Sequence, residues 1–411
     1  MNCHRRSTRP ASAFPHHQSI LTGGTVPVGI RKAEGYIPAL FLLFLVGISQ
    51  SSTGPLLPLF DKRYSSGAAG VPYLITAFFT GCLAAMVISS AVRSVGRRTL
   101  PLATALYAAG CAGIYLSGSL AAGLLGCALA GFGAGTVVLT VNSAFARQAN
   151  GVSLVNLLNG VFALGTVLGP LLAGASLKWG RPYGFLVAAL GALLCFRVSR
   201  VTAWGPREEP ADGGAPKALG RNALAVFLLL YLGYGGLETG IGAWAAKDIQ
   251  SQGHSAAAAA SIVAVFWGAT AVSKFGAVAL ARRVPTAGLV ITGLAGTSVF
   301  LFVASLPHGA VAGYLLAGLA LGPVFPSGLA WIAQRGGDRR SVGLAIAASM
   351  SGSVLFPTAI GWFVATDIRA VPLGLAFIGA CATLAAVGAH RTRRTPLAPP
   401  QRTAVGVAAS D

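Results

Sequence analysis

Apolar runs of about 20 residues, separated by short polar or glycine-rich breaks, recur along most of this chain. A helix of that length crosses the hydrocarbon core of a bilayer, because each residue adds about 1.5 Å. Hydrophobic residues make up 54% of the 411 positions and charged residues only 10%. A soluble domain carries roughly 25% charged residues. The chain is therefore predicted to be a multi-pass, all-α membrane protein.

Twelve spanning helices account for these runs, in two sets of six. We expect them at about residues 36–60, 70–92, 99–119, 121–147, 152–177, 182–203, 222–246, 255–281, 286–306, 309–333, 342–365 and 370–389. Prolines and glycines at 204–221 predict a flexible cytoplasmic linker between the halves. Residues 36–203 and 222–389 would then form two six-helix bundles. The basic stretch 1–35 is expected to be a disordered tail, and 390–411 a second tail.

The net charge of +20 comes from Lys and Arg residues that flank the apolar runs. In a soluble protein this charge would suggest a nucleic-acid partner, but here it is a topology signal. Most of these residues lie in the tails, the linker and the loops on one side. The opposite side carries few: Lys62, Arg63, Lys178, Arg181, Lys247 and Arg369. Both termini are therefore expected in the cytoplasm of a cell-membrane protein that binds no nucleic acid.

No pattern typical of an enzyme or a cofactor site occurs in the sequence. The six cysteines show no CxxC pair and no metal-ligand spacing, so we expect neither a disulfide nor a metal. There is no phosphate-binding loop, no nucleophile–base pair and no domain-sized segment outside the membrane. We expect a protein without cofactors that is not an enzyme.

One acidic residue stands apart from the others. Glu238 lies among glycines inside the apolar run 224–246, whereas the other acids, including Asp248, fall at segment ends, in loops or in the tails. A carboxylate at bilayer depth costs about 2.5–3.5 kcal/mol and usually faces a cavity or a partner. We interpret Glu238 as a proton-exchanging group in a transport cavity, since burial favours its neutral form. The alternative is an acid that merely packs.

The two halves share a motif at constant spacing. Gly-Thr-Val-Leu-Gly-Pro-Leu-Leu-Ala-Gly at 165–174 matches Gly-Ser-Val-Leu-Phe-Pro-Thr-Ala-Ile-Gly at 352–361, with five identities 187 positions apart. Two parallel six-helix repeats with a binding site between them are typical of secondary transporters. The motif therefore favours an internal duplication.

Several further motifs resemble those of a known family. They are Gly-Pro-Leu-Leu-Pro at 54–58, Asn-Leu-Leu-Asn-Gly at 156–160, Tyr-Leu-Gly-Tyr-Gly-Gly-Leu-Glu at 231–238, Phe-Trp-Gly-Ala-Thr at 266–270 and Gly-Pro-Val-Phe-Pro-Ser at 322–327. Together they resemble the major facilitator superfamily, and within it the branch of fucose permease and related sugar–proton symporters. The resemblance covers residues 36–389. It implies two pseudo-symmetric six-helix bundles that move a solute by alternating access.

Two positions depart from that family. A loop signature with Asp-Arg-x-Gly-Arg-Arg has Arg93 at its aspartate position, although Gly96-Arg97-Arg98 is intact. Relatives often carry an acid four residues before an asparagine, and before Asn142 this chain has Val138 instead. Glu238 is then the sole candidate for a proton carrier.

Polar and aromatic side chains inside the spans complete the predicted site. Neutral amides suit a solute rich in hydroxyl or amide groups, an indole stacks on a sugar ring, and a cation suits an anionic solute. The candidate substrate-binding residues are Gln50, Asn142, Asn156, Asn159, Trp267 and Lys274. The amides could instead join helices, and Lys274 could extend to the membrane surface. For Trp244, an interfacial position is favoured.

These observations predict a secondary active transporter of a small polar, sugar-like solute, coupled to protons through Glu238. We expect it to work as a monomer in the bilayer. Export of a drug or secondary metabolite by proton antiport is the alternative, and a membrane sensor is a remote third. The sequence leaves the solute, the direction and the coupling ion open.

Overall fold

The computed structural model describes residues 28–64, 70–91, 98–146, 151–199, 219–280, 283–364, 367–368 and 370–391. In this part of the chain the helices are α1 Val28–Ser52, α2 Leu57–Tyr64, α3 Tyr73–Ala91, α4 Thr99–Leu116, α5 Leu120–Ala146, α6 Gly151–Trp179, α7 Tyr183–Ser199, α8 Arg221–Ser251, α9 Ala256–Leu280, α10 Thr286–Ala304, α11 Ala310–Leu321, α12 Val324–Gln334, α13 Arg339–Val364 and α14 Ala370–Arg391.

Some of the sequence predictions fall on residues that the structure does not describe. These are most of the two tails, most of the linker at 204–221, and Arg93 with Gly96 and Arg97 of the loop signature. One helix starts well before its prediction, because α1 begins at Val28, within the stretch expected to be a tail.

Ten segments of the described residues are long and apolar enough to cross a membrane when a bent helix pair is taken as one span. Nine are single apolar stretches, and α11 with α12 forms one of these, Ala310–Gln334. A tenth consists of α1 and α2, which are bent by 67° relative to each other. Two shorter apolar helices, Tyr73–Ser89 and Tyr183–Phe196 within α3 and α7, lie at the positions of the second and sixth predicted spans. The predicted all-α fold, with twelve spans in two six-helix bundles, is confirmed.

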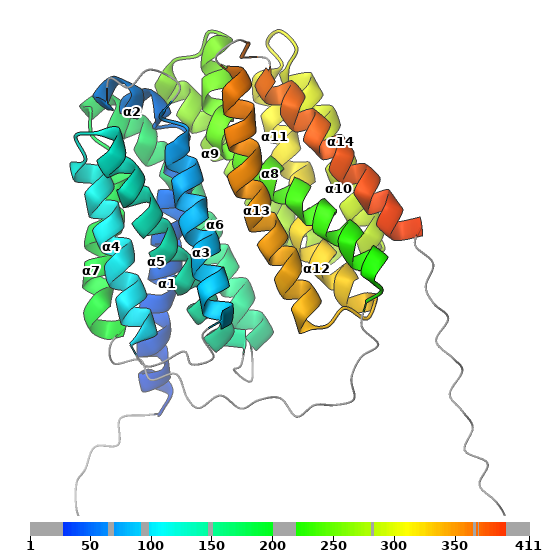
Figure 1. Cartoon of the computed structure of the whole chain (residues 1–411), viewed down its shortest axis with the longest axis horizontal. Helices are drawn as coiled ribbons and strands as arrows, with labels where there is room; N and C mark the ends of the chain where they lie inside the picture. The colour runs from blue at the N-terminus through cyan, green and yellow to red at the C-terminus, as the bar shows by residue number, and fades with distance from the viewer. Residues whose placement is uncertain are drawn as a thin grey trace, which may run out of the picture.

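The two bundles lie side by side (Figure 1). The N-terminal bundle contains α1 to α7 and the C-terminal bundle contains α8 to α14. Contact between the bundles runs mainly along two helix pairs, α6 with α9 and α3 with α13. The start of α1 and the end of α14 lie on the same side of the molecule, which we call the terminal face, and the other side is the opposite face.

Glycines allow the helices within each bundle to cross closely. Gly47 of α1 lies against the carbonyl oxygen of Phe162 in α6, and Gly235 of α8 lies against the carbonyl oxygen of Ser349 in α13. A Cβ at either glycine would collide with the facing backbone, so only a residue without a side chain fits. The same crossing therefore occurs once in each bundle.

The two bundles differ at the end of their first helix, because α1 is followed by a bend. Pro55 has no backbone N–H and cannot continue the helical hydrogen bonding of α1. The chain turns there, and α2 lies on the opposite face (Figure 1). In the C-terminal bundle, α8 has no proline at the corresponding place and continues unbroken to Ser251.

Two residues of α8 correct the sequence interpretation. Trp244 is only 1% exposed and donates its indole N–H to the carbonyl oxygen of Pro357 at 2.9 Å, so it does not belong to an interfacial belt. Asp248 is only 2% exposed, because α8 continues past the predicted end at 246. The hydroxyl of Tyr314 donates to its Oδ2 at 3.0 Å and makes this burial possible. Glu238 is therefore not the only acid inside a spanning helix.

Candidate functional site

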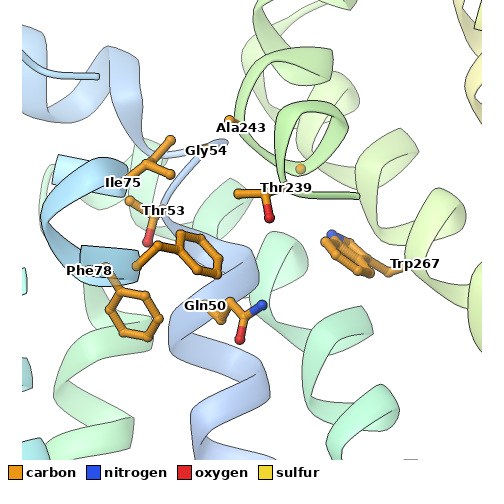
Figure 2. Close-up of a pocket in the computed structure, with 10 residues that line it drawn as sticks. Gln50, Thr53, Gly54, Ile75, Phe78, Thr239, Ala243 and Trp267 are labelled. Atoms are coloured by element: carbon orange, nitrogen blue, oxygen red, sulfur yellow. The ribbon is translucent and has the colours of Figure 1, made fainter. Parts of the chain in front are cut away.

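A small cavity lies between the two bundles (Figure 2). Its volume is about 20 Å³, which leaves room for about one water molecule. It is lined by Gln50, Thr53, Gly54, Ile75, Phe78, Phe79, Thr239, Gly242, Ala243 and Trp267. One wall comes from α3 and the end of α1, and the other comes from α8 and α9. The cavity therefore belongs to both bundles, as expected of a site whose shape changes when the bundles move.

Two hydrogen-bonding groups at this cavity have no partner within the described residues. Trp267 is only 6% exposed, and its indole Nε1 is buried without a hydrogen-bond partner. The Gln50 amide extends from α1 toward the side of the cavity on which Trp267 lies (Figure 2). A buried donor without an acceptor costs free energy, typically 1–3 kcal/mol. An oxygen atom of a bound molecule would satisfy this donor.

An ion pair lies next to this cavity, on its terminal-face side. The Nζ of Lys274 in α9 is 3.2 Å from Oε1 of Glu238 in α8. Glu238 precedes the cavity residue Gly242 by one turn of α8, and Lys274 follows Trp267 by two turns of α9. The side chains are 22% exposed for Glu238 and 33% for Lys274. Lys274 is thus held inside the bundle and does not extend to the membrane surface.

Neighbouring side chains hold Glu238 in place on α8. Tyr234, one turn earlier on the same helix face, interacts with the carboxylate. Thr239 donates its hydroxyl to Oγ of Ser353 in α13 at 2.8 Å, and Ser353 itself donates to the carbonyl oxygen of Gly235 at 3.2 Å. These bonds fix the rotation of α8, so that Glu238 faces α9 while Thr239 reaches both α13 and the cavity.

The two bundles are in close contact on the opposite-face side of the cavity. Gly54 lies against the carbonyl oxygen of Gly242, and a Cβ at Gly54 would collide with it. The hydroxyls of Thr76 in α3 and Thr358 in α13 are 2.5 Å apart. The indole N–H of Trp362 donates to the hydroxyl of Tyr73 at 3.3 Å. The bundles are therefore closed on this side.

The same bundles separate toward the terminal face. The ribbons of α3 and α13 diverge in that direction (Figure 1). Val87 and Ile88 near the end of α3 are 59% and 49% exposed. An apolar space of about 370 Å³ lies between α6 and α9, lined by Leu157, Gly160, Val161, Ala163, Leu164, Ala271 and Phe275. The interface between the bundles is thus tight at one face and loose at the other.

Comparison with known proteins agrees with this architecture. Residues 39–285 match the model of the Major Facilitator Superfamily. The chain belongs to this superfamily. It is a secondary active transporter of the membrane, with the solute site expected between its bundles.

Individual relatives are more distant. The glucose/mannose transporter GlcP of Bacillus subtilis (strain 168) is 25% identical over 369 residues, which cover 83% of this chain and 90% of GlcP. A crystal structure of a D-xylose-proton symporter superposes with a TM-score of 0.71 at 15% identity, covering 88% of this chain and 97% of the symporter. FucP, a superfamily transporter in the outward conformation, has a TM-score of 0.59 at 13% identity, covering 86% and 98%. These structural matches share the fold.

The structure brings together some of the predicted site residues of this transporter and separates others. Gln50 and Trp267 line the cavity, and Glu238 with Lys274 lies beside it. Asn142 and Asn159 do not line it, and each donates its amide to a carbonyl oxygen of its own helix at 2.9 Å. The side chain of Asn156 lies outside the described residues.

Sequence reasoning missed three features of this region. Thr239 lines the cavity next to Glu238, and Gly54 meets Gly242 across the bundle interface. The pairing of Glu238 with Lys274 was also missed, although both residues had been singled out separately. The sequence contained a usable signal for this region. Gly54 and Gly242 are 188 positions apart, as are Gln50 and Glu238, and this spacing is within one residue of the 187 positions that separate the two proline motifs. The duplication thus extends from the proline motif to the site.

Proposed function

We propose that this transporter carries a small hydroxylated solute of the sugar class together with a proton. The observation that carries the proposal is the juxtaposition of two unpartnered hydrogen-bonding groups, on Gln50 and Trp267, with the Glu238–Lys274 ion pair at the bundle interface. Similarity to a transporter named for glucose and mannose supports the solute class.

The cavity offers the chemistry that sugar hydroxyls need. The Gln50 amide can donate and accept hydrogen bonds, and the Trp267 indole donates one through Nε1. The flat indole also provides an apolar surface for the C–H face of a sugar ring. In the described arrangement, which is closed at the opposite face, the cavity holds about one water molecule, so a sugar fits only when the bundles move apart around it.

Glu238 is the proposed proton carrier. When it is ionised, its carboxylate accepts a hydrogen bond from the Lys274 ammonium. When a proton binds, the attraction between the two side chains is lost and both become free to reorient. Solute and proton then influence each other's binding because both act on the same pair, which is the thermodynamic requirement for coupling.

Orientation follows from the charge distribution. We infer that the terminal face is cytoplasmic, because Lys and Arg concentrate in the tails, the linker and the loops on that side. The described arrangement, closed at the opposite face, then corresponds to the inward-facing stage of the cycle in a cell membrane. A single chain contains both halves of the site, so a monomer suffices.

Replacement of the carrier tests this proposal. Glu238→Gln keeps the size and fixes the neutral state, so proteoliposomes should lose pH-driven accumulation of a radiolabelled hexose while retaining exchange at equal concentrations. Asp248→Asn is a matched control, because it removes a buried acid from the same helix outside the cavity. If Glu238→Gln still accumulates the hexose from a proton gradient alone, Glu238 is not the carrier.

A second candidate function rests on the apolar space between α6 and α9. Leu157, Leu164 and Phe275 are exposed there and would admit an amphiphilic molecule from the bilayer. Proton-driven export of such a compound is the alternative. Cells that express the transporter should then tolerate higher concentrations of amphiphilic toxins, and Leu164→Trp, which narrows the space, should reverse this effect.

A further inference from the structure

The ammonium group of Lys274 is only partly engaged. It carries three N–H donors, and among the described residues Glu238 is its one hydrogen-bond partner, at 3.2 Å. A third of the side chain remains exposed although it comes from the interior of α9. A cation held at this depth is stabilised by a nearby anion, and removal of that anion costs free energy.

Protonation of Glu238 would remove that anion. The cavity lining contains no charged residue that could replace it. Within the described residues, the ion pair of Lys274 is with Glu238. The titratable neighbour of Glu238 on its own helix is the phenol of Tyr234. The other acid of α8, Asp248, lies ten residues further along the helix and is hydrogen-bonded to Tyr314 of α11. A neutral sugar carried with a proton would leave Lys274 as an uncompensated cation.

We propose that the solute supplies the missing anion, so that Lys274 binds the carboxylate of a sugar acid. This inference rests on the proposed proton-coupled function and narrows its substrate class. In the resting pair, the Glu238 carboxylate and the Lys274 ammonium cancel. On loading, Glu238 takes up one proton and the solute carboxylate takes its place beside Lys274. The site is neutral before and after, and one proton accompanies one monoanion.

The spacing along α8 suits such a solute. Glu238 lies four residues from Gly242 at the cavity, which corresponds to about 6 Å of helical rise. A six-carbon acid can therefore place its carboxylate at Lys274 while its hydroxyls reach Gln50 and Trp267. The two recognition elements, one charged and one neutral, then belong to one elongated site.

Binding to purified full-length protein tests this inference. The probes are D-gluconate, D-galactonate and D-glucuronate, each beside its uncharged counterpart: D-glucitol, galactitol and D-glucose. At least one acid should bind on the order of tenfold more tightly than its counterpart, because a charge-assisted hydrogen bond is added. Calorimetry in two buffers of different ionisation enthalpy should show uptake of about one proton per bound acid.

Variants of the pair separate a specific role from a structural one. Glu238→Gln should bind the acid without proton uptake and with a flat pH profile. Lys274→Gln should lose binding of the acid, whereas Lys274→Arg should retain it. Because Lys274→Gln leaves an unpaired acid and could fail to fold, the double variant Glu238→Gln/Lys274→Gln, which has no unpaired charge, should also bind no acid.

The outcomes distinguish this inference from the proposed function. Unchanged binding of the acid by the double variant would overturn the role of Lys274. Proton-coupled accumulation of a neutral hexose, with no binding of any acid, would overturn the anionic solute class while leaving the proposed function intact. Binding of an acid to the wild-type protein without proton uptake would contradict both.

Discussion

The crossing of α1 with α6 in the N-terminal bundle and that of α8 with α13 in the C-terminal bundle use the same contacts. Gly165 lies on the carbonyl oxygen of Phe44, and its repeat equivalent Gly352 lies on the carbonyl oxygen of Leu232. The neighbouring helices agree. Gly131 of α5 lies on the carbonyl oxygen of Phe78 in α3, and in the C-terminal bundle Gly318 of α11 lies on the carbonyl oxygen of Phe266 in α9. The duplicated backbone geometry is therefore a property of all four helix pairs.

Within this common geometry the side chains at the site differ. Positions 188 apart carry Gln50, Phe79 and Met86 in the N-terminal bundle, and Glu238, Trp267 and Lys274 in the C-terminal bundle. Gln50 thus occupies the repeat position of Glu238, Phe79 that of Trp267, and Met86 that of Lys274. The N-terminal bundle thus contributes the neutral Gln50 amide to the site, whereas the C-terminal bundle contributes Trp267 together with the ion pair that we propose carries the proton.

The largest effect is expected where the two repeats touch. Gly54 and Gly242 occupy equivalent positions and lie against each other across the bundle interface. Gly54→Val would put a branched side chain into the facing backbone, so the bundles could not close at the opposite face and solute uptake should be abolished. Gly276→Ala on α9 is the control, because a Cβ there meets open space. Normal uptake by Gly54→Val would show that the contact is not needed.

A smaller effect is expected from giving the C-terminal bundle the residue of its counterpart. Lys274→Met introduces the side chain found at Met86 and leaves Glu238 without its cation. The free energy of unfolding should fall by about 1–3 kcal/mol, a modest loss because the pair is partly exposed, and the melting temperature should fall with it. Adding Glu238→Gln should recover most of this loss, since the site is then neutral in both bundles. No recovery in the double variant would mean that Lys274 stabilises α9 by packing alone.

The smallest effect is expected at the hydrogen bond between α3 and α13. Thr358→Val removes the hydroxyl that meets Thr76 and should destabilise the closed opposite face by about 1 kcal/mol. A cysteine at Tyr73 should then react faster with a membrane-impermeant maleimide applied from outside. Thr383→Val is the control, because Thr383 bonds only within its own helix. Equal labelling rates in Thr358→Val and Thr383→Val would contradict a role in closure.

Most of the fold could be predicted because the length of an apolar run is itself a structural constraint. Eleven of the predicted spans begin within a few residues of the helices observed, and only α1 begins well before its predicted start, at Val28. The exceptions reflect partners distant in sequence. The burial of Asp248 depends on Tyr314 in α11, and that of Trp244 on Pro357 in α13. No pattern local to α8 contains this information.

The site was predicted less completely than the fold. Glu238 and Lys274 were recognisable as charges in apolar runs, but their pairing depends on how α8 and α9 rotate against each other. The asparagines were selected by polarity alone, and Asn142 and Asn159 turn out to bond their own helices. Repeat spacing was the unused signal, since it relates Gln50 to Glu238 directly.

Solute-induced proton movement tests the division between the bundles most directly. Solute is added to weakly buffered proteoliposomes, and the external pH is followed with wild-type protein, Glu238→Gln and Asp248→Asn side by side. The account predicts an alkaline transient on solute entry with the wild type and with Asp248→Asn, and none with Glu238→Gln, although the latter still exchanges solute. An equal transient with Glu238→Gln would show that the proton is carried elsewhere and would contradict the account.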